Sequence, residues 1–301
     1  MWVPPSRVAD VRIATWNVNS IRARIDRVAA FLQRHDVDVL ALQETKCADA
    51  QFPAMPLLQL GYEVAHHGRN QWNGVAIISR VGLSDVELGF PGMPSYLEPA
   101  APAVESVPTV ADPLPLPQVE PTARAEIAPE ARALGATCAG VRIWSLYIPN
   151  GRELGHPHLD YKLEWLAALR TAGQGWLHAE PTAQIVLMGD WNIAPQDDDV
   201  WDMGFFEGRT HVSAPERAAF ANVVATGFAD VVRPHTPGPG VYTYWDYTQL
   251  RFPKKQGMRI DFALASPALA ARVSGAFIDR EERKGKGASD HAPVVVDLTP
   301  R

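Results

Sequence analysis

A short apolar run that ends in an acid and an amide is the feature that most constrains the fold of this chain. Residues 184–188 read Gln-Ile-Val-Leu-Met, and Gly189, Asp190, Trp191 and Asn192 follow. Such a run is typical of a buried strand. Polar residues at the carboxyl edge of a sheet lie where open α/β sheets bind ligands, and side chains two residues apart on a strand share a face. Gly-Asp and Asn are also turn residues, so this stretch alone leaves a simple turn open.

Four further predicted strands carry polar side chains at or beside an end. These strands are residues 11–16, 37–42, 259–265 and 293–298, and the polar residues beside them are Asn17, Glu44, Asp261, Asp290 and His291. Converging carboxylates repel one another unless a cation balances them. Oxygen donors without cysteine favour Mg²⁺, for which Mn²⁺ substitutes, over zinc. The candidate metal ligands are Asn17, Glu44, Asp190, Asn192, Asp290 and His291.

The remaining pattern alternates strands with helices. Helical spacing of apolar residues predicts helices over 21–35, 159–171 and 215–226, with a short helix within 52–60. Further strands are predicted over 62–66, 74–79, 131–137, 141–147 and, in an aromatic run, 242–247. Because several strands follow one another directly, the pattern favours a two-sheet α/β sandwich over a purely parallel doubly wound sheet.

Residues 94–130 differ in composition from the rest of the chain. Nine of the 26 prolines lie there, with six acidic residues against one arginine. Such a segment cannot bury enough apolar surface to offset the cost of ordering it. We expect a disordered loop inserted into one domain that spans residues 11–299; a tether that docks a partner is the alternative.

Charge and cysteine content narrow the function classes. The chain has a net charge of −6, but residues 94–130 carry five of those negative charges. A core that is close to neutral, with several acids gathered at one site, is compatible with a phosphodiester ligand. Two cysteines form no disulfide framework, and no apolar run is long enough to cross a membrane. We therefore expect a cytoplasmic protein that acts without a membrane.

A histidine and a tyrosine complete the predicted site. His291, paired with a carboxylate, is a good donor to a phosphate oxygen, because the pairing favours the imidazolium form. Asp261 is the expected partner. Tyr147 ends its strand beside the same edge, where its hydroxyl reaches a phosphate or a leaving oxygen, although a lone strand tyrosine is more often a core residue.

Six motifs, in order along the chain, resemble those of the exodeoxyribonuclease III family of apurinic/apyrimidinic endonucleases. They read Trp-Asn-Val-Asn from residue 16, Leu-Gln-Glu-Thr-Lys from 42, Tyr-Ile-Pro-Asn-Gly from 147, Met-Gly-Asp-Trp-Asn from 188, Met-Arg-Ile-Asp from 258 and Ser-Asp-His-Ala-Pro from 289. Each motif alone is weak, but six in order are highly specific. The resemblance covers roughly residues 12–298, apart from the proline-rich insert.

The resemblance implies a four-layered α/β sandwich, in which two face-to-face mixed sheets are flanked by helices. It implies Mg²⁺-dependent hydrolysis of the phosphodiester 5′ to an abasic site in duplex DNA. At the same site it implies 3′-to-5′ exonuclease and 3′-phosphatase or phosphodiesterase activity. The expected partner is duplex DNA with abasic sites or 3′ ends, bound by a monomer. The alternative is a phosphoesterase on the same fold that acts on RNA or small phosphoesters.

The family chemistry assigns a role to each residue. Glu44 is the principal metal ligand, with Asn17 and Asp290 nearby. Asp190 deprotonates the attacking water and Asn192 fixes it; in a two-metal scheme Asp190 is a ligand. The catalytic set is Tyr147, Asp190, Asn192, Asp261 and His291. A pocket for the abasic sugar is expected from Tyr244, Met258 and Ile260, and phosphate contacts from Arg22, Arg24, Lys46, Arg69, Arg152, Lys162 and Lys254.

Overall fold

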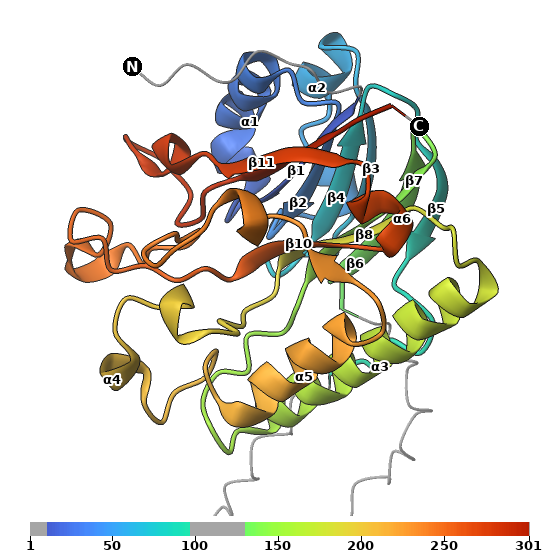
Figure 1. The fold of residues 1–301 in the computed structure, drawn as a ribbon. Coiled ribbons are helices and arrows are strands. Elements are labelled where there is room, and N and C mark those ends of the chain that lie inside the picture. Colours follow the sequence, from blue (N-terminus) through green and yellow to red (C-terminus); the bar gives the residue numbers. More distant parts are fainter. Residues whose placement is uncertain (1–10, 97–129, 301) are drawn as a thin grey trace, which may run out of the picture.

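Two mixed sheets packed face to face form the centre of the protein. A computed structural model describes residues 11–96 and 130–300. Within these residues each sheet has six strands, in the orders β11-β12-β1-β2-β4-β3 and β5-β6-β7-β8-β10-β9. Helices cover the outer faces (Figure 1). The expected four-layered sandwich is confirmed.

The first sheet takes its strands from both ends of the chain. They are β1 (Val11–Asn17), β2 (Val39–Gln43), β3 (Glu63–His67), β4 (Val75–Ser79), β11 (Val273–Ile278) and β12 (Val294–Leu298). Strand β1 runs parallel to β2 and antiparallel to β12. The two central strands therefore end at one edge, with Asn17 opposite Gln43.

The second sheet is built from the middle of the chain. Its strands are β5 (Ser84–Leu88), β6 (Ala133–Cys138), β7 (Val141–Tyr147), β8 (Ile185–Asp190), β9 (Ala229–Asp230) and β10 (Asp261–Ala265). Strands β7 and β8 run parallel, and Tyr147 lies opposite Asp190. Strand β10 runs antiparallel to β8 and places Asp261 opposite Asp190 from the other side. Three predicted site residues thus meet at the end of β8.

Two groups of helices form the outer layers. The helices are α1 (Ile21–His35), α2 (Met55–Gln59), α3 (Pro157–Ala179), α4 (Met203–Phe206), α5 (Ala214–Val224) and α6 (Pro267–Ala270). Helix α1 covers the first sheet, and α3 and α5 lie side by side under the second (Figure 1). Helix α5 begins with a capping box. The Ser213 side chain accepts the backbone N–H of Glu216, and the Glu216 side chain accepts the backbone N–H of Ser213.

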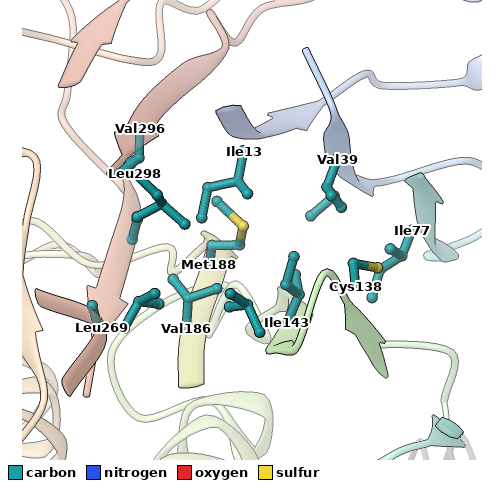
Figure 2. Packing of buried hydrophobic residues seen from close by; sticks show 14 of the residues in the cluster. Ile13, Val39, Ile77, Cys138, Ile143, Val186, Met188, Leu269, Val296 and Leu298 are labelled. Carbon is teal, nitrogen blue, oxygen red and sulfur yellow. The ribbon is translucent and has the colours of Figure 1, made fainter. Parts of the chain in front are cut away.

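The core between the sheets is apolar and continuous. Ile13 and Val39 from the first sheet meet Ile143, Val186 and Met188 from the second (Figure 2). At the centre, Gln43 Nε2 donates to Ser145 Oγ at 3.0 Å and to Thr15 Oγ1 at 3.0 Å. A buried polar group of this kind must be hydrogen-bonded, and here its bonds join the two sheets directly below the strand ends that carry the site.

The aromatic run at residues 242–247 is not a strand, which corrects the prediction. Tyr244 forms isolated bridges to Met258 and His291 instead of a ladder. Aromatic residues favour strands chiefly because they pack well on a half-buried surface. Here they lie in a loop that packs beside the site, so they are half-buried without forming a strand. Strand β5 was not predicted; it is short and exposed along its whole length, so it lacks the buried face of the other strands. Helix α3 is also longer than expected.

Most of the proline-rich insert lies outside the described residues, which leave out 97–129. Its two ends are described. Tyr96 packs against Tyr161 of α3, with ring centres 5.1 Å apart, and Glu130 accepts a hydrogen bond from Asn73. Within the described ranges, no helix is long and apolar enough to cross a membrane.

Candidate active site

The Asp190 turn is held in place by a glycine and by its own hydrogen bonds. A Cβ on Gly189 would lie 1.9 Å from the carbonyl oxygen of Leu146, so only glycine allows β7 to approach β8 this closely. Asn192 has a left-handed backbone with φ 50°, and its N–H donates to Asp190 Oδ1 at 2.9 Å. A turn therefore brings Asp190 and Asn192 together, and the strand alternation expected from sequence does not.

Glu44 directly follows β2 in a strained conformation. Its φ is 52°, a region that is costly for a residue with a Cβ and that persists only where the surroundings impose it. Ser20 N–H donates to the Glu44 carbonyl at 2.7 Å, and Thr45 N–H donates to the Gly74 carbonyl at 3.1 Å. These bonds fix the turn that points the Glu44 carboxylate toward the second sheet.

Asn17 joins the carboxylates of the two sheets. Its Nδ2 donates to Glu44 Oε1 at 2.8 Å and to Asp190 Oδ2 at 3.0 Å. Its Oδ1 accepts the N–H of Asn19 at 3.0 Å. In this arrangement Asn17 positions the two acids with its amide hydrogens, and its role as a metal ligand stays a prediction.

His291 lies between two aspartates. Its Nδ1 is 2.9 Å from Asp261 Oδ2, the partner expected from sequence, and its Nε2 is 3.8 Å from Asp190 Oδ2. All three side chains are buried. Thr243 Oγ1 accepts the N–H groups of Ile260 and Asp261, each at 3.1 Å, and so fixes the start of β10 beneath the histidine.

Burial and charge set opposite protonation tendencies in this group. Burial raises the pKa of Asp190 to about 7; the nearby His291 charge opposes this shift, and the Asp261 and Glu44 charges add to it. Burial alone would lower the pKa of His291, but the charges of Asp261 and Asp190 outweigh it and raise that pKa to about 10. Lys46 and Asn17 outweigh burial at Glu44 and lower its pKa. A histidine that stays protonated therefore faces an aspartate that exchanges a proton near neutral pH.

Three of these side chains fit a metal ion. Ligand atoms of Glu44, Asp190 and His291 all lie within 4.8 Å of one another. The second oxygen of Asp261 is buried and has no hydrogen-bond partner, which adds unbalanced negative charge beside the group. The two carboxylates suit a divalent cation, and His291 could join them as a ligand only when its Nε2 carries no proton. Asp290 does not belong to this cluster: its Oδ1 accepts from Asn19 Nδ2 at 3.1 Å. Its role as a ligand stays a prediction.

Tyr147, at the end of β7, lies beside Glu44. Burial, followed by the Glu44 charge, raises the pKa of its hydroxyl well above the usual value. The guanidinium of Arg132 stacks on its ring at 4.9 Å. Tyr147 is therefore held as a protonated hydroxyl that can donate a hydrogen bond at the catalytic edge.

Two of the three predicted pocket residues line a cleft beside the histidine. The Tyr244 ring lies 4.9 Å from the His291 ring. Tyr244 and Met258 line a cleft of about 770 Å³. Ile260 is only 2% exposed and packs in a small core with Val200 and Phe206, so its expected place in the pocket wall is not observed.

Most of the predicted phosphate contacts are accessible. Arg22, Arg69 and Arg152 are exposed, and Arg24 and Lys46 are half-buried. Lys46 Nζ lies 2.6 Å from Glu44 Oε2, directly at the site. The surface positions fit the prediction, but DNA contact itself stays a prediction for these residues.

Lys162 is the exception, and its predicted phosphate contact is wrong. Its side chain has no exposed surface, and its Nζ pairs with the equally buried Glu216 at 2.5 Å. The same ammonium donates to the carbonyls of Asn192 at 2.7 Å and Asn150 at 3.2 Å. Spacing along a helix shows which face a lysine is on, but not that a buried acid from α5 lies opposite.

Several polar residues that the sequence reasoning did not select support the site. Asn150 Nδ2 donates to Asn192 Oδ1 at 3.1 Å, and Ser289 Oγ donates to the Asn17 carbonyl at 2.7 Å. Trp16 Nε1 donates to the carbonyl of His291 at 3.0 Å. Each of these residues lies inside one of the quoted motifs, so the motifs themselves could have identified them.

These groups match what a phosphate ester requires. The carboxylates offer oxygen donors for a cation and a base for water, and His291 offers a permanent donor for a phosphate oxygen. Carried at one edge of a two-sheet sandwich, they define a phosphoesterase of the metal-assisted kind. The comparison with known families agrees: the Endonuclease/Exonuclease/phosphatase family model matches residues 14–291, and the chain belongs to this family.

Individual relatives are similar over almost the whole chain. An exodeoxyribonuclease III from Haemophilus influenzae is 27% identical, and the alignment covers 96% of this chain and 100% of that protein. The DNA repair nuclease APEX1 from Danio rerio is 26% identical, covering 97% of this chain and 83% of its own. The resemblance to the exodeoxyribonuclease III group is therefore confirmed, and the protein is a nuclease.

A solved structure shows the same fold. The 3′ phosphatase NExo from Neisseria, bound to a product DNA hairpin, is 33% identical, with a TM-score of 0.82, and covers 96% of this chain and 100% of its own. This likeness spans both sheets and the helices outside them.

Proposed function

We propose that this protein is a Mg²⁺-dependent DNA repair nuclease that hydrolyses the phosphodiester 5′ to an abasic site in duplex DNA. The same site would remove nucleotides and phosphate groups from 3′ ends. The main observation in support of this proposal is the cluster of Glu44, Asp190 and His291, which lies beside a cleft lined by Tyr244 and Met258. The cytoplasmic location and monomeric state expected from sequence remain part of this proposal.

The charged groups of the site divide the work of hydrolysis. His291, held at Nδ1 by Asp261, donates from Nε2 to a non-bridging phosphate oxygen. Asp190, held by the Asn192 N–H, accepts the proton of the attacking water. A bound Mg²⁺, held principally by Glu44, would neutralise charge on the phosphate. Tyr147 donates a hydrogen bond to the 3′-oxygen as it leaves.

Selection of an abasic site requires the nucleotide to leave the helix. An extrahelical sugar needs an apolar contact beside the reacting phosphate. The Tyr244 ring, which adjoins His291, and Met258, which pairs with Tyr244, supply this contact. Exposed Arg22, Arg69 and Arg152 would hold the flanking phosphates.

A 3′-phosphatase is the second candidate, favoured by the 33% identical NExo structure with its product hairpin. Both activities use the same phosphate chemistry and differ in what lies beyond the phosphate. A phosphoesterase of RNA or small phosphoesters needs the same charged cluster but no sugar contact.

The deciding experiment offers three labelled substrates with Mg²⁺ and, separately, with EDTA. They are a duplex with one abasic-site analogue, the same duplex undamaged, and a nicked duplex with a 3′-phosphate. We expect Mg²⁺-dependent cutting on the 5′ side of the abasic analogue. Release of phosphate alone would assign the protein as a 3′-phosphatase, and hydrolysis of RNA but none of these substrates would contradict the proposal.

A further inference from the structure

The turn that carries Glu44 is held by a row of three side chains that have no part in the hydrolysis described above. His66 Nε2 lies 2.8 Å from Thr45 Oγ1, and His66 Nδ1 lies 2.8 Å from Asp49 Oδ1. The same Asp49 oxygen accepts the N–H of Gly68 at 2.8 Å. The row therefore connects the residue after Glu44 to the end of β3 and to the loop at Asp49.

The protonation of His66 fixes the direction of these contacts. Burial lowers the pKa of His66 to about 4, although the Asp49 charge opposes the shift, so the ring is neutral near pH 7. A carboxylate only accepts hydrogen bonds, so the single ring proton lies on Nδ1, toward Asp49. Nε2 is then an acceptor, and the Thr45 hydroxyl donates to it. The histidine therefore imposes one orientation on the Thr45 side chain.

Close packing keeps the row in place. The His66 side chain is only 6% exposed, and its ring centre lies 4.5 Å from that of Phe52. A Cβ on Gly74 would lie 2.1 Å from Thr45 Oγ1, so only glycine allows the chain to pass this close to the hydroxyl. Thr45 itself has no exposed surface. These contacts leave the Thr45 side chain no second position.

The turn at Glu44 needs support of this kind. Glu44 and Lys46, on either side of Thr45, both have φ of 52°. This left-handed conformation is costly for residues with a Cβ, and it persists only where the surroundings impose it. Thr45 is the buried residue between the two strained ones, so its side chain is placed to hold both.

A hydroxyl, a histidine and a carboxylate in a row are also the parts of a hydrolytic triad. The complete burial of Thr45 excludes that role, because no substrate can reach its hydroxyl. Its neighbour Glu44 is half-buried and lies in the cluster with Asp190 and His291. The row therefore acts through the turn and does not touch the substrate.

We propose that Asp49, His66 and Thr45 are positioning residues, which hold the Glu44 carboxylate where it binds the divalent cation. The inference rests on the proposed function, in which Glu44 is the principal metal ligand, and extends it to residues outside the metal cluster. Loss of a group that orients a metal ligand typically lowers metal affinity about 10–100-fold. Breaking the contact between Thr45 and His66 should therefore weaken cation binding although every ligand is still present.

Two substitutions of His66 separate its two contacts. In His66→Gln the amide reaches the position of Nε2, where its oxygen accepts the Thr45 hydroxyl. In His66→Asn the amide takes the place of Nδ1 and reaches only Asp49. Both variants lose the ring contact with Phe52, so each is the control for the other. Electron paramagnetic resonance of Mn²⁺, without DNA, measures the affinity.

We expect the dissociation constant for Mn²⁺ to rise about tenfold or more in His66→Asn and to change little in His66→Gln. Equal affinities in the two variants would overturn the inference. A purely structural role would lower the melting temperature of both metal-free variants and leave the Mn²⁺ affinity of the folded protein unchanged.

Substitutions of Thr45 repeat the test from the other end of the contact. Thr45→Val keeps the shape of the side chain and removes the hydroxyl, whereas Thr45→Ser keeps the hydroxyl. The valine variant should bind Mn²⁺ about tenfold more weakly than wild type, and the serine variant should bind it like wild type. Wild-type affinity in Thr45→Val would contradict the inference.

A measurement on wild type does not depend on the folding of any variant. Nitrogen-15 NMR of the His66 ring should show its proton on Nδ1, and a proton on Nε2 would overturn the inference. Mn²⁺ binding as expected without cutting of the abasic duplex would refute the proposed function alone. Normal cutting with one Mn²⁺ affinity in every variant would refute the positioning role alone, and wild type that binds no Mn²⁺ would refute both.

Discussion

At the scale of single residues, hydrolysis at this site depends most on Asp190. Its carboxylate is buried and lies between Asn17, His291 and Asn192. Asp190→Asn keeps the shape of the side chain but removes the proton acceptor. We expect turnover on the abasic duplex to fall at least about a hundredfold, the usual loss when a group acts chiefly in the transition state. DNA affinity, measured in EDTA, should survive.

The matched control for this variant is Asp197→Asn. Asp197 is mostly exposed and makes only a surface ion pair with Arg217. Such pairs contribute little, so this variant should keep wild-type rates. A near-normal rate in Asp190→Asn would refute the mechanism.

The pKa of the same residue predicts how the rate depends on pH. Burial, with the Asp261 and Glu44 charges, raises the pKa of Asp190 to about 7 in the absence of a cation. Asp190 is a base only when deprotonated, so single-turnover rates should rise with pH through this region. A cation beside the carboxylate favours its charged form and lowers its pKa. The pH of half-maximal rate should therefore move down as Mg²⁺ is raised, and a midpoint independent of Mg²⁺ would contradict this role.

The sequence predicted correctly the site residues that lie at or beside the end of a strand. His291 and Asp261 were paired correctly because an imidazole among acids needs a carboxylate partner. The phosphate contact of Lys162 was predicted wrongly, because the role of this lysine depends on a contact between two helices. Its ammonium is buried against Glu216 of α5. No spacing rule carries this information.

At the scale of elements, the ion pair of Lys162 and Glu216 connects helix packing to the site. It joins α3 to α5 and holds the backbone carbonyls of Asn192 and Asn150. Lys162→Met leaves a buried carboxylate unpaired, which costs about 3–5 kcal/mol. We expect urea unfolding to show that loss. Arg170→Met, at an exposed position on the same helix, is the control and should unfold like wild type.

A double variant separates stability from positioning. Lys162→Met with Glu216→Gln removes both charges, so most of the lost stability should return. The carbonyls of Asn192 and Asn150 still lack their donor, and the turn that carries Asn192 should remain poorly fixed. The single-turnover rate should therefore stay below wild type even where stability is recovered. Full recovery of both would show that Lys162 is only a packing residue.

At the scale of the whole molecule, the two-sheet arrangement followed from the order of strands, but the edge strands did not. Strands β2 and β8 contain continuous apolar runs, and β1 and β7 are rich in β-branched and aromatic residues, so the sequence displays all four. Strand β5 is exposed at every position, so its place depends on pairing with β6. Edge strands of this kind are defined by a neighbour far along the chain. Local composition cannot reveal them.

Buried histidines make the whole fold sensitive to acid. Burial lowers the pKa of His66 and of His158 to about 4, and that of His211 to about 3. The unfolded chain binds protons at these residues near pH 6.5. Stability from the neutral histidines is therefore complete above about pH 6.5 and is lost as pH falls toward 4, on the order of 1–2 kcal/mol per histidine at pH 5.

Thermal unfolding between pH 7.5 and 5 checks this sensitivity. His158 accepts the N–H of Gly151 at Nδ1, and the amide oxygen of asparagine can take its place. His158→Asn cannot gain a proton on unfolding, so its melting temperature should fall less between pH 7.5 and 5 than that of wild type. His178→Asn, at an exposed position on the same helix, should follow wild type. If all three proteins lose stability equally, His158 does not contribute to the acid sensitivity and the prediction for this residue is wrong.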